Sequence, residues 1–129
     1  MSTKKDVFTL KSVYEKIIDG SYDYDTTGDP GTLWTWGDNN IGQLGDNTTI
    51  NRSSPIQIAG TTWIEIAGGG HHSLARKSDG TLWAWGCNSS GQLGDNTTIH
   101  RSSPVQIAGT TWIDIVANGW YHSLARKSL

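Results

Sequence analysis

The sequence predicts an all-β protein built from two copies of one four-stranded unit. A long segment occurs twice: Gly31 to Ile66 recurs as Gly80 to Ile115, with 29 of 36 positions identical. Within each copy, apolar and polar residues alternate with a period of two, as they do in strands. Runs rich in Gly, Asn and Asp separate the alternating stretches, and these residue types favour turns.

The duplication divides the chain into three parts. Residues 1–30 are unique, residues 31–79 form repeat one, and residues 80–129 form repeat two. After a one-residue insertion in repeat two, the heptapeptide "HSLARKS" at 72–78 returns unchanged at 122–128. Repeat periods between about 20 and 50 residues are typical of solenoids, propellers and arrays.

Each repeat contains about four short strand candidates. They are "TLWTW", "PIQI", "TWIEIA" and "HSLARKS" in repeat one, and their counterparts in repeat two. Four short antiparallel strands are the content of one β-propeller blade. We therefore expect two four-stranded blades.

A hairpin is predicted at the centre of the chain, across the repeat boundary. Two alternating runs flank Asp79-Gly80 in "HSLARKSDGTLWAWG". Asp-Gly between two strands is a strong hairpin signal, and it favours a type I′ turn, in which both central residues have positive φ.

Tryptophan is unusually frequent, and six of the seven Trp residues recur in equivalent positions of the two repeats. Because Trp side chains bury large areas, we expect these six to form the blade core. They are Trp34, Trp36, Trp63, Trp83, Trp85 and Trp112.

Several motifs together resemble a known repeat family. "GTLWAWGCNSSGQLGDNTT", "RSSPVQI" and "IAGGGHHSLARKSDG" fall in one order with a period near fifty. In this they resemble repeats of the regulator-of-chromosome-condensation family. The resemblance implies seven-bladed propellers, mostly used for protein binding; the founding member is a guanine-nucleotide exchange factor that docks on chromatin. This chain has two repeats, and no match to the loops specific to that exchange factor is found.

Composition excludes several function classes. The net charge is −2, and residues 31–129 carry six basic and six acidic side chains. No basic stripe points to nucleic acid. No apolar run approaches the ~18 residues of a membrane span, and residues 1–30 lack the apolar core of a secretory signal. The cellular location stays open, with a virion, a bacterial surface and the cytoplasm as alternatives.

The sequence offers no convincing catalytic, metal or cofactor site. His72 and His122 recur without acidic or Cys partners at ligand spacing, so we interpret the repeated His as capping backbone groups beside a Gly-rich turn. The "DNNIGQLGDN" segment lacks the Gly position and terminal Glu of a calcium loop. Ser73 and Ser123 have no neighbouring base and orienting acid. We therefore expect no enzyme activity, no metal and no cofactor.

Residues 1–30 are predicted to form an N-terminal helix and a polar linker. An apolar stripe with helical spacing follows the potential N-cap Thr9 and ends before Gly20. Two alternatives are open: the helix covers one end of the blades, or it anchors the chain to a sister chain or another structural protein. The segment "DVFTLKSVYEK" also resembles the leader of small structural proteins from marine phages. The stripe consists of Leu10, Val13, Tyr14, Ile17 and Ile18.

The ends of the duplicated region predict assembly. The hairpin is complete once; its second strand recurs alone near residue 32 and its first strand recurs alone near residue 125. Unpaired strands invite pairing with another chain, and a propeller needs about four to eight blades. We expect a head-to-tail homo-oligomer that completes a ring, with a trimer favoured and a tetramer as the alternative. The expected pairing residues are Thr32, Leu33, Trp34, Thr35 and Trp36 against His122, Ser123, Leu124, Ala125 and Arg126.

The predicted function is that of a non-enzymatic structural or binding module, such as a phage virion appendage or a bacterial surface protein. The alternative is a regulatory adaptor, an exchange-factor-like propeller that binds a partner protein. Neutral charge and the missing loops argue against the alternative.

Overall fold

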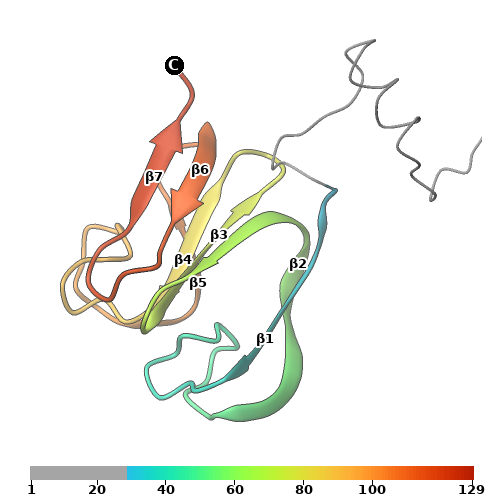
Figure 1. Ribbon diagram of the computed structural model, residues 1–129, viewed down its shortest axis with the longest axis vertical. Helices are drawn as coiled ribbons and strands as arrows, with labels where there is room; N and C mark the ends of the chain where they lie inside the picture. The colour runs from blue at the N-terminus through green and yellow to red at the C-terminus, as the bar shows by residue number, and fades with distance from the viewer. Residues whose placement is uncertain (1–28) are drawn as a thin grey trace, which may run out of the picture.

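A computed structural model describes residues 29–129, and the anchor helix predicted within residues 1–28 lies outside them. Seven strands follow one another in the described part of the chain (Figure 1). They are β1 (Gly31–Gly37), β2 (Arg52–Gly68), β3 (His72–Lys77), β4 (Leu82–Gly86), β5 (Arg101–Ile107), β6 (Trp112–Val116) and β7 (Leu124–Lys127). The all-β prediction is confirmed for this part of the chain.

The strands do not group by repeat, as two separate four-stranded blades would require. They form one five-stranded sheet in the order β1-β2-β3-β4-β5 and a two-stranded sheet of β6 and β7. The long β2 serves two partners, because its first part pairs with β1 and its last part pairs with β3. One complete four-stranded blade therefore consists of the last part of β2 with β3, β4 and β5, and it spans the repeat boundary.

Two half-blades flank this central blade. The pairing of β1 with the first part of β2 repeats that of β4 with β5: Leu33 lies opposite Ile58, as Leu82 lies opposite Ile107. The pairing of β6 with β7 repeats that of β2 with β3 in the same way. β1 and β7 lie on opposite sides of the molecule (Figure 1).

The predicted hairpin at the repeat boundary is present, but its turn differs from the predicted type. β3 and β4 pair along their length, with Leu74 opposite Ala84. Only Gly80 of the Asp-Gly pair has positive φ, at 85°. The Asp79 carboxylate instead accepts hydrogen bonds from the backbone N–H and hydroxyl of Thr81, at 3.1 and 2.6 Å. A three-residue loop that ends in a left-handed Gly fits this geometry, and the type I′ prediction is wrong.

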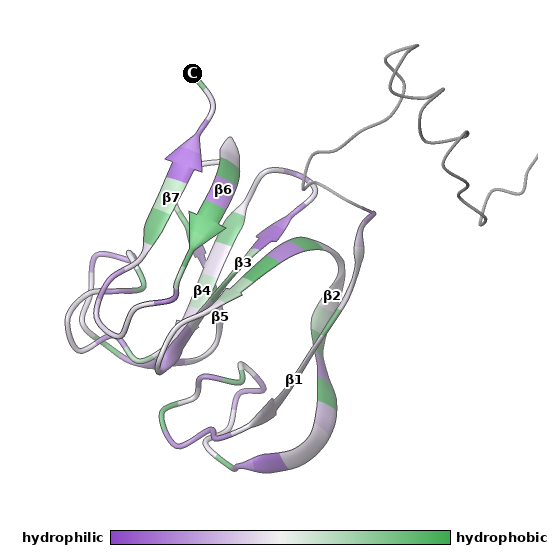
Figure 2. Cartoon of the chain, viewed as in Figure 1, coloured by the Kyte–Doolittle hydropathy of each residue, from purple (hydrophilic) through white to green (hydrophobic). Residues whose placement is uncertain are grey.

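The apolar core consists of two clusters, each between the central blade and one of the half-blades. Side chains of β1, β2, β3 and β4 form the first cluster, in which Trp63 and Trp85 are 5% and 1% exposed. Side chains from β3 to β6 and the 87–100 loop form the second. Green, apolar segments of the ribbon accordingly alternate with polar ones along the strands (Figure 2).

The prediction that all six recurring Trp residues are core is wrong for two of them. Trp34 and Trp36 on β1 are 48% and 60% exposed. Their counterparts on β4 are covered because β3 pairs with one edge of β4 and the first half-blade packs beside it. Among the described residues, no strand pairs with the outer edge of β1. Trp83 and Trp112 are half-buried.

Candidate functional site at the open strand edges

The polar residues that recur in the two long loops make hydrogen bonds within those loops. Asn39 is fully buried, and its amide nitrogen donates to the carboxylate of Asp46 and to the backbone oxygens of Thr48 and Ile50. Its side-chain oxygen accepts from the backbone N–H of Leu44 at 3.0 Å. Asn88 makes the same contacts in repeat two. Recurrence of this motif therefore reflects loop structure.

Asp46 and Asp95 hold these two loops as charged acceptors. Burial raises the pKa of Asp46, but hydrogen bonds from Thr48, Arg52 and Asn39 outweigh it and lower the pKa from 3.8 to about 2. The same balance acts on Asp95 in repeat two. Each carboxylate also forms an ion pair with an Arg of the following strand, at 2.8 and 2.9 Å. Neither carboxylate is free for metal or acid–base chemistry.

The repeated His has a different role from the predicted backbone cap. His72 is 1% exposed, and its Nε2 lies 2.9 Å from the Ser123 hydroxyl of the other repeat. That hydroxyl donates to the carbonyl of Gln92 at 2.7 Å, so Nε2 of His72 carries the proton. Burial lowers the pKa of His72, and the electrostatic interaction with His122 lowers it further. The imidazole thus joins two blades in its neutral form.

The residues described by the structure contain no group of three or more potential metal ligands. Within the same residues, no helix is long and apolar enough to cross a membrane. What stands out is a pair of strand edges, one at each side of the molecule.

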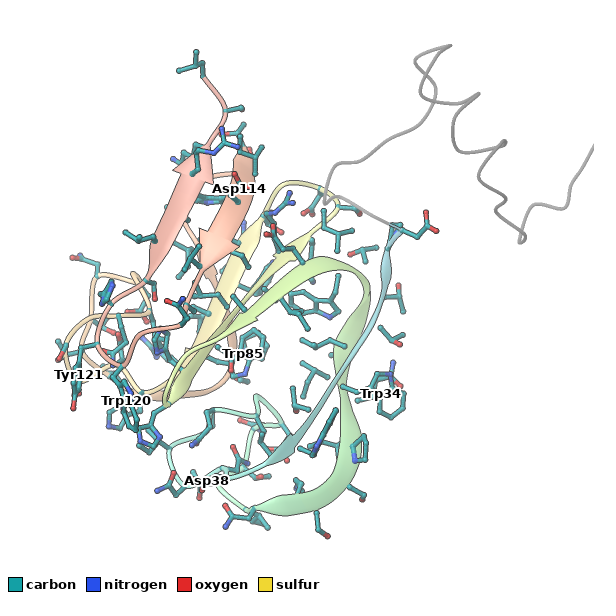
Figure 3. All side chains as sticks on the ribbon, in the orientation of Figure 1. Trp34, Asp38, Trp85, Asp114, Trp120 and Tyr121 are labelled. Atoms are coloured by element: carbon teal, nitrogen blue, oxygen red, sulfur yellow. The ribbon has the colours of Figure 1, made fainter. Side chains whose placement is uncertain are left out.

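The first edge belongs to β1, and the second belongs to β7. All four residues of β7 are exposed, including Leu124 at 62%. β1 presents Trp34 and Trp36, and Figure 3 shows Trp34 pointing away from the sheets while Trp85 lies between them. The predicted pairing residues therefore lie on two separate edges, and they do not contact one another within the chain.

A contact made by Arg76 in the complete central blade shows what the corresponding residue of β7 lacks. Arg76 on β3 is 3% exposed, bonds Glu65 at 2.8 Å, and reaches the backbone oxygen of Trp112 on the neighbouring half-blade at 3.2 Å. Its counterpart Arg126 keeps the acidic partner Asp114 at 2.7 Å, but its side chain is 69% exposed. The difference arises because β7 has no half-blade beside it among residues 29–129.

A second contact involves a cation over indole rings. The ammonium group of Lys77 lies 4.8 Å from the Trp63 ring and 4.4 Å from the Trp83 ring. Its counterpart Lys127 lies 4.8 Å from the single ring of Trp112. The ring corresponding to Trp83 is that of Trp34, which lies on the opposite open edge.

Repeat two also carries an aromatic pair that the sequence analysis did not single out. Trp120 and Tyr121, in the loop that contains the one-residue insertion, are 56% and 65% exposed (Figure 3). The Trp120 ring meets His71 edge-on at 4.8 Å and covers Gly70. The mismatch between "AGGGHH" and "VANGWYH" was the available signal, since it is the longest departure from the duplication.

The fold and its open edges define a segment of a β-propeller. The repeat model described as "Regulator of chromosome condensation (RCC1) repeat" matches residues 30–76 and 79–126, and a second model with the same description matches residues 63–92. The chain therefore belongs to the RCC1 repeat family, whose propellers are protein-binding modules.

Three solved structures show the same fold at low sequence identity. Human WBSCR16 has a TM-score of 0.63 at 24% identity over 77% of this chain and 27% of its own. Yeast RCC1 (Prp20), solved bound to Kap60, has a TM-score of 0.63 at 18% identity over 92% and 29%. Prp20p from Saccharomyces cerevisiae has a TM-score of 0.64 at 20% identity over 90% and 29%. The chain thus spans less than a third of the length of these proteins.

Proposed function

We propose that this chain is a non-enzymatic protein-binding module that joins copies of itself head to tail through β7 of one copy and β1 of the next. The observation that carries the proposal is the β3–β4 hairpin. It pairs "HSLARK" with "LWAWG", and the open edges carry "LARK" on β7 and "GTLWTWG" on β1. The molecule thus contains a complete example of the contact that both edges lack.

The hairpin also gives the register of the proposed contact. Leu74 lies opposite Ala84, and Ala75 lies opposite Trp83. The aligned residues place Leu124 of one copy opposite Thr35 of the next, and Ala125 opposite Trp34. A shift by one residue would turn every side chain to the wrong face of the sheet. Register is therefore a specific and measurable part of the proposal.

The proposed contact would convert each pair of half-blades into a complete blade. Each copy then contributes strands for two blades, so three copies make six and four copies make eight. Both numbers fall in the range of known propellers. We favour the trimer, and we propose that the N-terminal segments anchor the ring to another structural protein.

Mass in solution tests the assembly, and a pair of cysteines tests the register. In a Cys87→Ser background, we expect Thr35→Cys combined with Leu124→Cys to give covalent oligomers under mild oxidation. The matched control combines Thr35→Cys with Arg126→Cys, which is two residues out of register and should cross-link far less. A wild-type chain that stays monomeric at all concentrations would overturn the proposal.

Absence of enzyme activity is part of the same proposal. Its support is that the recurring Asn, Asp, Arg and His side chains hold loops and blade junctions. A phage appendage or a bacterial surface protein remains the setting that we predict from the sequence. Hydrolytic activity that persists through purification and is lost on Ser123→Ala would contradict the non-enzymatic assignment.

The second candidate is a regulatory adaptor. It is favoured by the fold shared with Prp20p, whose structure was reported with "Its Binding Properties to Gsp1p and Histones". Specific capture of a purified small GTPase by the 129-residue chain, with accelerated nucleotide release, would favour this candidate over self-assembly.

A further inference from the structure

The chain contains one filled binding site for an indole ring, and this site defines the chemistry that such a site needs. Trp85 is 1% exposed, and its Nε1–H donates to the backbone oxygen of Gln43 at 2.9 Å. The same oxygen accepts the hydroxyl of Ser73 at 2.8 Å. The ring packs directly on Gly45, where an added Cβ would lie 2.7 Å from Nε1 of Trp85. Trp63 closes the site edge-on at 6.2 Å.

The second repeat builds the same site without an indole from this chain. The backbone oxygen of Gln92 accepts the hydroxyl of Ser123 at 2.7 Å, as Gln43 accepts Ser73. Gly94 takes the place of Gly45 and has the same left-handed backbone, with φ of 80° against 84°. A Cβ added at Gly94 would meet nothing closer than Ile107, at 3.9 Å. Gln92, Gly94 and Trp112 line a cavity of about 400 Å³ in the described part of the molecule.

We propose that this cavity is the receptor for Trp36 of a second copy, and that insertion of this indole is the main anchor of the assembly. Trp36 is the residue of repeat one that corresponds to Trp85, and it is 60% exposed on the open edge of β1. Its Nε1–H would donate to Gln92, and its ring would pack on Gly94 and Trp112. The inference rests on the proposed head-to-tail function.

Two features make Trp36 an anchor and not merely one contact among many. A few residues carry most of the binding energy of an interface, and Trp in a well-packed pocket is enriched among them. The receptor is also preorganised, because Ser123 is held by both Gln92 and His72. Backbone pairing between β7 and β1 sets the register, whereas indole insertion supplies the affinity.

The test compares three variants of the full chain by mass in solution across a concentration series. We expect Trp36→Ala to weaken association by about thirtyfold or more. Gly94→Asn should have the same effect from the opposite side, because Asn tolerates the left-handed backbone and its side chain would occupy the place of the indole ring. Asn47 and Asn96 already adopt φ of 65° in the neighbouring turns. Trp120→Ala, which removes an exposed Trp outside the cavity, is the matched control and should associate like the wild type.

The outcomes separate this inference from the function on which it rests. If Trp36→Ala and Gly94→Asn both assemble like the wild type, the indole anchor is wrong while head-to-tail pairing stands. If the wild-type chain does not associate at all, both fall. If Trp36→Ala does not fold, as judged by circular dichroism, Gly94→Asn decides alone, since its site has room for a side chain in the isolated molecule.

Discussion

Gly45 and Gly94 have identical sequence surroundings, but only Gly45 is confined by a neighbouring side chain. Both lie in "GQLGDNTT" and both have positive φ. Gly45 is confined by the ring of Trp85, whereas the space above Gly94 is open in the single chain. The requirement for glycine at position 45 is thus twofold, conformational and steric.

We therefore expect Gly45→Asn to destabilise the folded chain while Gly94→Asn does not. The Asn side chain at position 45 would displace Trp85 from the core, and overpacking of this kind typically costs about 1–3 kcal/mol. Thermal unfolding at concentrations below assembly measures the difference. Equal melting temperatures for the two variants would contradict the description of Trp85 as the ring that covers Gly45.

A second prediction at this scale concerns Trp85 itself. Trp85→Ala should lower the free energy of unfolding by about 3–5 kcal/mol, because it opens a cavity in the core. Trp120→Ala should change it by much less, because more than half of the Trp120 side chain is exposed. Urea titration of the two variants beside the wild type gives both values. Similar losses for the two would show that burial of the indole does not decide its contribution.

His72 makes the stability of the fold depend on pH. Burial lowers its pKa below the ordinary value of 6.5, so the unfolded chain binds a proton more readily than the folded chain does. Stability from this group is present above pH 6.5 and is lost as the pH falls through the folded pKa. We expect His72→Gln to flatten this acid limb below pH 6.5. A chemical-denaturation series over that range, with an unchanged slope in the variant, would contradict the assignment.

At the scale of the element, hydrogen bonds from buried side chains organise the 38–51 and 87–100 loops, although these loops contain no regular secondary structure. A buried Asn and a charged Asp organise each loop from within. Because the Asp pKa is lowered to about 2, each carboxylate stabilises the fold above the unfolded value of 3.8 and loses its contribution as the pH falls toward 2.

We therefore expect Asp95→Asn to reduce the stability at pH 7 by about 2 kcal/mol, which is the free-energy equivalent of the pKa difference. Asp38→Asn, an exposed carboxylate that caps only the N–H of Asn40, is the matched control and should have little effect. Acid titration followed by circular dichroism should show a smaller transition between pH 4 and 2 for Asp95→Asn than for either the control or the wild type.

The sequence predicted these elements unevenly. Period-two alternation and duplication predicted the strands and the central hairpin, because both signals are local. The exposure of Trp34 and Trp36 could not be predicted from their residue type, because it depends on whether a neighbouring strand covers β1. The indole site at Gly94 also could not be predicted from the sequence. It becomes visible only when the surroundings of two identical motifs are compared in the structure. The type I′ turn was predicted wrongly, because the Asp79 carboxylate accepts hydrogen bonds from the backbone N–H and hydroxyl of Thr81.

At the scale of the whole molecule, the chain folds as one complete blade and two half-blades. Covalent joining of copies can therefore test whether the half-blades complete one another. Residue 129 is Leu where the central hairpin has Asp79. A tandem chain in which Leu129→Asp is followed directly by Gly31 of a second copy would recreate "HSLARKSDGTLWTWG" at the joint. The tandem chain would thus contain a second complete blade in place of two half-blades.

We expect a three-copy tandem chain of this kind to be monomeric, because three copies close the favoured ring of six blades. Its thermal stability should exceed that of the single chain and should not depend on concentration, since its closing contact is intramolecular. Light scattering checks the mass. Continued association of the three-copy chain, together with a monomeric four-copy chain, would replace the six-bladed ring with one of eight.

The two open edges also have a consequence for mixtures of wild-type and mutant chains. A Gly94→Asn copy would have a blocked receptor at β7 but would still carry an intact β1 with its Trp36. Such a copy would join a growing ring at one end and then prevent the next addition, so in a trimer each mutant copy would arrest up to two wild-type partners. A mutation of this type would act dominantly, with an effect that grows with the number of copies in the ring. A Trp36→Ala, Gly94→Asn double mutant would have neither binding surface, and it would be harmless to wild-type chains in the same mixture.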